Sequence, residues 1–317
     1  MPILKGLTAA LAWLGRQGTT ALAVSVFFGL AVPQLASFFK PYLGVTVFMM
    51  LVFSYLRTDP RAFRDYVKRP GLPLLAMLWV MIGMPLLFGG LYAAIGLREA
   101  NPALHQVMIL HLLASPITAS AAIAALLGLD VAFTLLSMIL SVAVSPFLTV
   151  AFSYLFLGTS LFSPLDLGVK LFLFLSSTAA LAAIIRKIFG QPAIERQKDV
   201  IDGLNVIAIF VFAIVAMESV PRNVVADPRF ALVLLIVVSG LAVAMIGLSA
   251  LLFWRIGRSR ALAVGLLTAF RNLGIIMAAI GAALPDVAWF YFALAQFPIY
   301  LTPALLKPLA GRLTATR

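Results

Sequence analysis

The stretch FALVLLIVVSGLAVAMIGLSALLFW, residues 230–254, decides the fold class of this chain. It carries no charged residue and is long enough to cross the roughly 30 Å hydrocarbon core of a bilayer as a helix. A helix satisfies all of its own backbone hydrogen-bonding groups, which a membrane-spanning segment must do in the absence of water. Residues 230–254 therefore predict a transmembrane helix.

The rest of the chain has the same character. Hydrophobic residues make up 63% of the 317 positions and charged residues only 11%, and the mean hydropathy is +1.11. These values lie far outside the range of water-soluble domains. Apolar runs bounded by charge, Gly and Pro predict ten spans, near residues 19–35, 41–56, 71–95, 103–128, 131–157, 166–185, 201–219, 230–254, 261–284 and 287–306. We therefore expect an all-α membrane protein of ten transmembrane helices.

The first apolar run, 19–35, has a second interpretation as a secretory signal peptide. No Ala-x-Ala cleavage site closes it, and the runs that follow are equally hydrophobic. We interpret it as a true span.

The distribution of Lys and Arg predicts the orientation. With the N-terminus in the cytoplasm, 17 of the 23 basic residues fall in cytoplasmic segments and five in external ones, with Arg271 left inside a span. Such a bias is typical of membrane proteins with positively charged cytoplasmic loops, and it requires an even number of spans. We expect a bacterial inner-membrane protein with both termini in the cytoplasm. The net charge of +12 is then explained by loops that face anionic lipid, and nucleic acid is excluded as a partner.

Ten spans divide into two halves of five. An odd number of spans per half means that any internal repeat is inverted across the membrane, as in many secondary transporters. We place the first five-helix repeat at 19–157, a connecting loop at 158–165 and the second repeat at 166–306. Residues 1–18 read as an interfacial helix or a disordered tail, and residues 307–317 as a cytoplasmic tail.

The fourth span of each half is interrupted. Residues 115–120 (SPITAS) break the first, because proline lacks a backbone N–H, and residues 268–274 (TAFRNLG) lie at the centre of the second. Discontinuous helices at corresponding positions of two halves indicate a substrate site at mid-membrane. The candidate substrate-binding residues are Ser115, Pro116, Thr118, Ser120, Thr268, Arg271 and Asn272.

Arg271 is the most informative of these residues. It lies about ten residues from either end of its span, so its charge does not reach the headgroups easily. One interpretation is an anion site, in which the guanidinium holds a carboxylate or a similar oxyanion. The other is a structural arginine that donates hydrogen bonds to the carbonyls of a broken helix.

The other intramembrane polar residues leave alternatives open. Asn272 either caps the second half-helix or coordinates a bound group. Hydroxyl groups inside membrane helices often bond their own backbone. His111, like His105, is a proton site or simply a hydrogen-bonded histidine. Gln296 and Pro298 are expected to shape helix packing.

Sequence motifs of enzymes are absent. The chain has no cysteine, and we find no metal-ligand cluster, no pair of carboxylates within a span, no Gly-x-Ser-x-Gly and no Walker sequence. We therefore expect neither an enzyme nor an ATP-driven pump, with no organic cofactor and no resident metal. A coupling Na⁺ or H⁺ stays open.

The interrupted spans also carry a resemblance. Residues 115–121 (SPITASA) stand where Pro-Gly-Gly-Thr-Ala-Ser-Asn is typical, and Arg271-Asn272 stands where Gln-Asn or Arg-Asn is typical, of the bile acid:sodium symporter family and its bile, auxin and arsenite carrier relatives. Similar matches are residues 129–134 (LDVAFT), Met84-Pro85, residues 48–51 (FMML) and residues 56–63 (LRTDPRAF). The resemblance covers nearly the whole chain. It implies a panel domain and a core domain, in which broken helices four and nine cross behind the substrate cavity.

The departures from this family bear on sodium. Sodium-coupled members have a glutamate at the position of Leu267 and an asparagine at the position of Ala121. Of the sodium ligands that the resemblance implies, only Ser120 and Thr134 keep an oxygen, and Arg271 would bring a competing cation. We expect sodium coupling to be weak or absent.

The sequence thus predicts a secondary transporter of a small organic anion, with a membrane sensor or scaffold that kept the transporter fold as the alternative. Substrate identity, direction of transport and oligomeric state are left open. The expected partners are the anion and membrane lipid.

Overall fold

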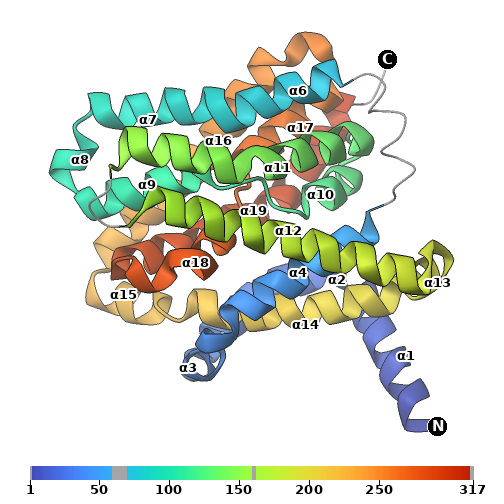
Figure 1. Cartoon of the computed structure of the whole chain (residues 1–317). Coiled ribbons are helices and arrows are strands. Elements are labelled where there is room, and N and C mark those ends of the chain that lie inside the picture. Colours follow the sequence, from blue (N-terminus) through green and yellow to red (C-terminus); the bar gives the residue numbers. More distant parts are fainter. Residues whose placement is uncertain (1, 59–69, 159–161, 315–317) are drawn as a thin grey trace. The chain divides into compact units, whose positions relative to one another are not determined.

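The computed structural model describes residues 2–58, 70–158 and 162–314 (Figure 1). In these ranges every regular element is a helix, and one isolated bridge is the only extended pairing of backbone. Six of the described helices are long and apolar enough to cross a membrane: Pro33–Arg57, Gly71–Ala94, Val131–Phe156, Pro164–Phe189, Lys198–Ala226 and Pro228–Leu252. The prediction of an all-α membrane protein with several spans is confirmed.

The other four expected spans contain shorter or differently bounded helices. Residues 19–35 hold α2 (Gly18–Ala31), which ends just before Pro33. Residues 103–128 and 261–284 each hold two helices separated by non-helical residues. The tenth span, expected to end at residue 306, is part of α19 (Asp286–Thr314), which continues through most of the expected tail. The basic loop around residues 59–69 lies outside the described ranges.

The chain divides into two compact units that do not follow the two halves. Unit 1 comprises Met1–Asp59 and Leu173–Pro228, and unit 2 comprises Pro60–Phe172 and Arg229–Arg317. Apart from residues 166–172, which belong to unit 2, each half of the chain therefore contributes first to unit 1 and then to unit 2.

Unit 1 is built around α14 (Lys198–Met217), on which α1 (Pro2–Arg16), α2 and α4 (Leu43–Arg57) pack. It also contains the end of α12 (Pro164–Phe189), α13 (Gln191–Arg196), α15 (Val220–Ala226) and α3 (Ala36–Phe39). Residues 2–16 thus form a helix rather than the disordered tail that the sequence left open.

Glycine allows the closest of these contacts. A Cβ atom at Gly203 of α14 would overlap the carbonyl oxygen of Leu11 in α1, and one at Gly15 would overlap the carbonyl oxygen of Asp199. Small residues at membrane helix interfaces let two backbones approach in this way. Arg16 adds an ion pair with Asp199 at 3.4 Å.

Unit 2 begins with a helix that contains a π-helical turn. Helix α6 (Gly71–Leu78) runs through the turn η3 (Trp79–Gly83) into α7 (Met84–Ala94), and α8 (Leu97–Ala100) follows. Next come α9 (Pro102–Leu113), α10 (Ser120–Leu126) and α11 (Val131–Phe156). Side chains start two of these helices, since Asn101 accepts a hydrogen bond from the Leu104 N–H and Asp130 accepts one from the Phe133 N–H.

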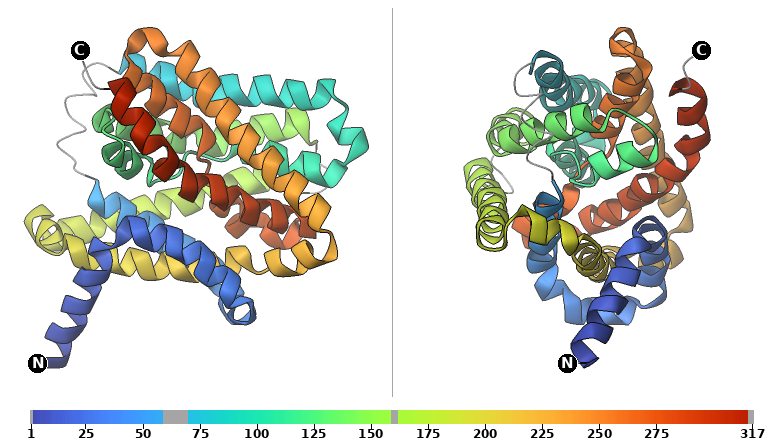
Figure 2. Two further views of the ribbon diagram at one scale, coloured as in Figure 1. Left: turned by 180° about the vertical axis from the view of Figure 1, so that it is seen from behind. Right: turned by 90° about the vertical axis from the view of Figure 1, so that its right-hand side faces the viewer.

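The second contribution to unit 2 is α16 (Pro228–Leu252), α17 (Arg258–Ala269), α18 (Leu273–Ile280) and α19. Helix α17 packs on both α16 and α19, as the rear view in Figure 2 shows. Gly265 of α17 faces the backbone of Ile246 in α16. Every residue of α17 from Ala261 to Ala269 is buried, so this helix forms the centre of unit 2.

Candidate functional site

Two breaks in the helices of unit 2 meet in an antiparallel pairing. Helix α9 stops at Leu113 and α10 begins at Ser120, while α17 stops at Ala269 and α18 begins at Leu273. Between them, Pro116 and Arg271 form an isolated antiparallel bridge. The prediction that helices are interrupted at these residues is confirmed, and their assignment to the fourth and ninth spans stays a prediction.

Backbone hydrogen bonds join the two breaks, which we call the crossing. The Ile117 N–H donates to the Phe270 carbonyl at 2.9 Å, and the Asn272 N–H donates to the Ser115 carbonyl at 2.7 Å. A helix break inside a membrane frees N–H and C=O groups that no water can satisfy. Here each break supplies the missing partners of the other, so the two depend on each other.

The end of α9 illustrates how fully these groups are satisfied. Three consecutive carbonyls that lack helical partners have three different donors. The Leu113 carbonyl accepts the Thr149 hydroxyl at 3.3 Å, the Ala114 carbonyl accepts Arg271 Nη1 at 3.0 Å, and the Ser115 carbonyl accepts the Asn272 N–H. This helix end is held from α11 and from the crossing at once.

Arg271 lies in the crossing with its side chain directed into the protein, and only 1% of the residue is exposed. Its Nε donates to the Thr268 carbonyl at 2.7 Å, and its Nη2 donates to the Val80 carbonyl at 2.7 Å. Its Nη1 contacts Met81 Sδ at 3.6 Å in addition to the Ala114 carbonyl. The hydrogen bonds to the carbonyls of broken helices, one of the two interpretations from sequence, are thus present, and an anion site at Arg271 stays a prediction.

The charge of Arg271 is stabilised by carbonyl dipoles rather than by an acidic side chain. Ala114 and Thr268 lie at the C-terminal ends of α9 and α17, where unpaired carbonyls carry partial negative charge. The ion pairs of the described residues do not include Arg271. A full positive charge is therefore held deep in unit 2 by neutral groups, and its net charge is not cancelled there.

The Val80 carbonyl is free for Arg271 because of the π-helical turn and the proline after it. In this turn the Met84 N–H bonds the Trp79 carbonyl instead of the Val80 carbonyl. The next N–H along the chain would come from residue 85, which is proline and has none. The only sign of this free carbonyl in the sequence was Met84-Pro85. A proline by itself does not identify the carbonyl that lacks a donor, because that depends on whether the preceding turn is α-helical or π-helical.

The other predicted substrate residues differ in exposure. Ser115, Pro116 and Ser120 are buried, and Thr268 is buried behind the crossing, where its hydroxyl lies 3.0 Å from Ser249 Oγ. Thr118 and Asn272 are partly exposed. Thr118 and Asn272 are therefore the predicted substrate residues at the crossing that are not fully buried.

Asn272 does not cap α18. It occupies the position before the first helical residue, but its side chain makes no capping hydrogen bond there. Capping was one of its two interpretations from sequence, and the structure contradicts it. Coordination of a bound group by the Asn272 amide stays a prediction.

The two hydroxyls expected at a sodium site bond their own backbone. Ser120 Oγ donates to the Ile117 carbonyl at 2.6 Å, and Thr134 Oγ1 donates to the Asp130 carbonyl at 2.7 Å. Leu267 is fully buried and offers no oxygen from its side chain. A sodium role for Ser120 and Thr134 stays a prediction, with few oxygen ligands to support it.

His111 forms a buried pair with Tyr291 of α19. His111 Nδ1 lies 2.7 Å from the Tyr291 hydroxyl, and no described residue contacts His111 Nε2 through a hydrogen bond. The hydrogen-bonded alternative for His111 is thus present, and its role as a proton site stays a prediction. Nothing in the sequence marked Tyr291, which is one aromatic residue in an apolar run.

The roles in helix packing expected for Gln296 and Pro298 stay a prediction. Gln296 is buried and its amide donates to the Phe292 carbonyl of its own helix at 3.1 Å. Neither residue belongs to the crossing.

No protein-family model and no curated protein matches this chain. The case for its function therefore depends on the crossing and on the residues around it.

Proposed function

We propose that this protein is a secondary transporter of a small organic anion that works by alternating access. The observation that carries the proposal is the antiparallel crossing of two broken helices with the buried charge of Arg271 beside it. Irregular backbone at membrane depth occurs where protein buries it or where it lines a cavity, and an ionisable residue within a span is by default the basis of a functional hypothesis.

The division of the chain supports an inverted repeat of two five-helix halves. Unit 1 takes residues 1–59 from the first half and 173–228 from the second, and unit 2 takes the remainder of each. The same order of contributions in both halves is what a duplicated five-helix segment produces. We infer that unit 1 is the panel and unit 2 the core implied by the resemblance to bile acid:sodium symporters, with α9–α10 and α17–α18 as the broken fourth and ninth spans.

Arg271 is the fixed positive charge of the proposed site. Its hydrogen bonds to carbonyls hold it in place, while its net charge attracts an anion over several ångströms in a medium of low dielectric constant. The partly exposed side chains of Thr118 and Asn272 would contact the anion directly. A cation that is part of the chain also removes the need for a dissociable one, which is why we propose weak or absent sodium coupling.

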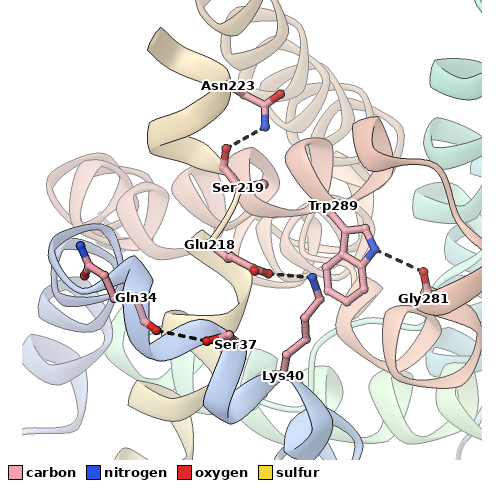
Figure 3. Close-up of polar contacts among 8 residues, drawn as sticks. All are labelled: Gln34, Ser37, Lys40, Glu218, Ser219, Asn223, Gly281 and Trp289. Atoms are coloured by element: carbon pink, nitrogen blue, oxygen red, sulfur yellow. Dashed lines mark hydrogen bonds and ion pairs between the residues drawn. The ribbon is translucent and has the colours of Figure 1, made fainter. Parts of the chain in front are cut away.

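Ion pairs support the proposed orientation. Arg16–Asp199, Arg57–Asp202 and Arg260–Asp130 each join segments that the charge distribution places in the cytoplasm. Lys40–Glu218, drawn in Figure 3, joins two segments that it places outside. An incorrect topology would put some of these partners on opposite sides of the membrane.

The test is uptake into proteoliposomes of radiolabelled acetate, pyruvate, succinate and cholate, with and without a sodium gradient. We expect saturable uptake of at least one carboxylate, unchanged by sodium, and a loss of at least about tenfold in Arg271→Gln, since a charge-assisted interaction is worth about 1.5–3 kcal/mol.

Arg186→Gln is the matched control. Arg186 also donates to three backbone carbonyls, those of Tyr55, Leu56 and Thr58, but it lies in unit 1. We expect this variant to keep uptake. Sodium-driven uptake that survives Arg271→Gln would overturn the proposal, and saturable binding without uptake would favour a sensor that kept the fold.

A further inference from the structure

A closed ring of hydrogen bonds connects Arg271 to α16 and to the π-helical turn. The Trp79 indole N–H donates to Ser249 Oγ at 3.0 Å, and Ser249 Oγ lies 3.0 Å from Thr268 Oγ1. The Thr268 carbonyl accepts Arg271 Nε, and Arg271 Nη2 donates to the carbonyl of Val80, the residue after Trp79. The ring thus starts and ends at η3.

The distances favour one direction of donation in this ring. Thr268 Oγ1 lies 2.7 Å from the Gly265 carbonyl, 3.4 Å from the Met245 carbonyl and 3.0 Å from Ser249 Oγ, so the Gly265 carbonyl is the nearest acceptor for its single hydrogen. A hydroxyl that donates to Gly265 accepts from Ser249 through a lone pair. Ser249 in turn accepts from Trp79, whose indole N–H is always a donor. The chain therefore runs from Trp79 through Ser249 and Thr268 to the carbonyl of Gly265.

Burial makes this chain costly to disturb. Ser249 and Thr268 are both fully buried, with 0% of each residue exposed. Removing one member leaves a buried polar neighbour without its partner, which costs more than the hydrogen bond itself contributes. Thr268 is common to both parts of the ring, since its hydroxyl bonds Ser249 while its carbonyl holds Arg271.

We propose that Trp79 and Ser249 are positioning residues for Arg271. They fix Thr268 and the π-helical turn, and these two groups fix the guanidinium at the crossing. Trp79 and Ser249 thereby set how strongly the site binds its anion, a consequence that rests on the proposed transport function. Neither residue touches the crossing itself.

The first measurement is the reactivity of Arg271 towards phenylglyoxal, a reagent that modifies arginine. The full-length protein is treated in mild detergent, and modification is read at each arginine by peptide mass spectrometry. We expect Arg271 to be protected in the wild type and to react about tenfold faster in Trp79→Phe and Ser249→Ala, because an opening that costs about 1.4 kcal/mol less is populated tenfold more.

Matched controls separate positioning from general loosening of unit 2. Trp289→Phe removes an indole N–H that donates to the Gly281 carbonyl at 3.2 Å (Figure 3). Ser141→Ala removes a buried hydroxyl that bonds its own helix at Ser137. We expect both variants to leave the reactivity of Arg271 within about twofold of wild type, since neither residue belongs to the ring.

Conservative replacement of Thr268 provides a rescue. Thr268→Ser keeps the hydroxyl and should keep Arg271 protected, whereas Thr268→Val keeps the shape and should expose it. Arg271→Lys removes the guanidinium that bonds both the Thr268 and the Val80 carbonyls, so the ring is already broken in this variant. Trp79→Phe should then lower the thermal unfolding midpoint less than it does in the wild type. A merely structural role for Trp79 would give the same change in both backgrounds.

Uptake of acetate, pyruvate, succinate and cholate by the same variants tests the functional consequence. We expect KM to rise about tenfold for Trp79→Phe and Ser249→Ala, with little change in the controls. If the wild type takes up no carboxylate while Arg271 reacts as expected, the transport function fails and the positioning role stands. If Trp79→Phe and Ser249→Ala leave Arg271 as protected as the controls do, the positioning role is overturned whatever the uptake.

Discussion

Arg186 in unit 1 and Arg271 in unit 2 make similar bonds in different surroundings. Each guanidinium donates to three backbone carbonyls, at the end of α4 for Arg186 and at η3, α9 and α17 for Arg271. Arg186 is half-buried and follows an apolar run at a predicted cytoplasmic end, whereas Arg271 is buried at the centre of a predicted span. Arg186 thus satisfies carbonyls at the end of a helix, at a predicted membrane surface. Arg271 makes the same kind of hydrogen bond but is a buried positive charge without an acidic partner.

Replacing each arginine by glutamine should give the largest difference. We expect Arg271→Gln to lower the free energy of unfolding by about 3–5 kcal/mol, because three buried carbonyls lose their donor, and Arg186→Gln to lower it by about 1 kcal/mol. Thermal unfolding in mild detergent measures both. Equal losses would mean that the depth of Arg271 has no energetic consequence.

Replacing Pro85 should have a smaller effect on the hydrogen bonds of Arg271. Pro85→Ala restores an N–H that can bond the carbonyls of the π-helical turn and compete with Arg271 for Val80. We expect Arg271 to react with phenylglyoxal about threefold faster while the unfolding midpoint stays the same or rises. Pro146→Ala, which removes a proline inside α11, is the control and should leave Arg271 protected.

The smallest expected effect is the influence of salt on an exposed ion pair, compared with its influence on the buried Arg271. Lys40 and Glu218 pair at 2.8 Å in unit 1 with side chains 46% and 33% exposed. Lys40→Ala should cost about 0.5 kcal/mol or less, and the loss should disappear in about 1 M NaCl, where exposed charges are screened. The loss caused by Arg271→Gln should persist at the same salt concentration. If it disappears, Arg271 is accessible to ions.

The interruptions of the helices could be predicted from sequence because their causes are local. Pro116 lacks a backbone donor, and Arg271 is a charge in an apolar run, so each marks its own span as unusual. Neither Pro116 nor Arg271 predicts that the two breaks form hydrogen bonds with each other. The resemblance to a transporter family implied only that the two broken helices cross, and the bonds from Ile117 to Phe270 and from Asn272 to Ser115 are seen in the structure alone.

The partners of Arg271 could not be predicted from sequence because they are backbone groups. A carbonyl has the same chemistry at every position, so Val80, Ala114 and Thr268 carry no side-chain signal. The sequence placed Thr268 among the substrate ligands on its position alone, and it gave no sign that the hydroxyl contacts Ser249 and the Gly265 carbonyl. The resemblance implied two domains, but the boundaries of the two units could not be predicted, because they follow contacts between distant parts of the chain.

A positive charge that cannot leave the protein has a thermodynamic consequence for a carrier of anions. When no soluble cation accompanies a monovalent anion, each transport event moves one negative charge across the membrane. A membrane potential of 100 mV contributes about 2.3 kcal/mol per charge, and in a cell with a negative interior it favours movement outwards. If the proposed carrier moves its anion without a soluble cation, transport is electrogenic, and net import into a cell with a negative interior requires a steep outside excess of the anion.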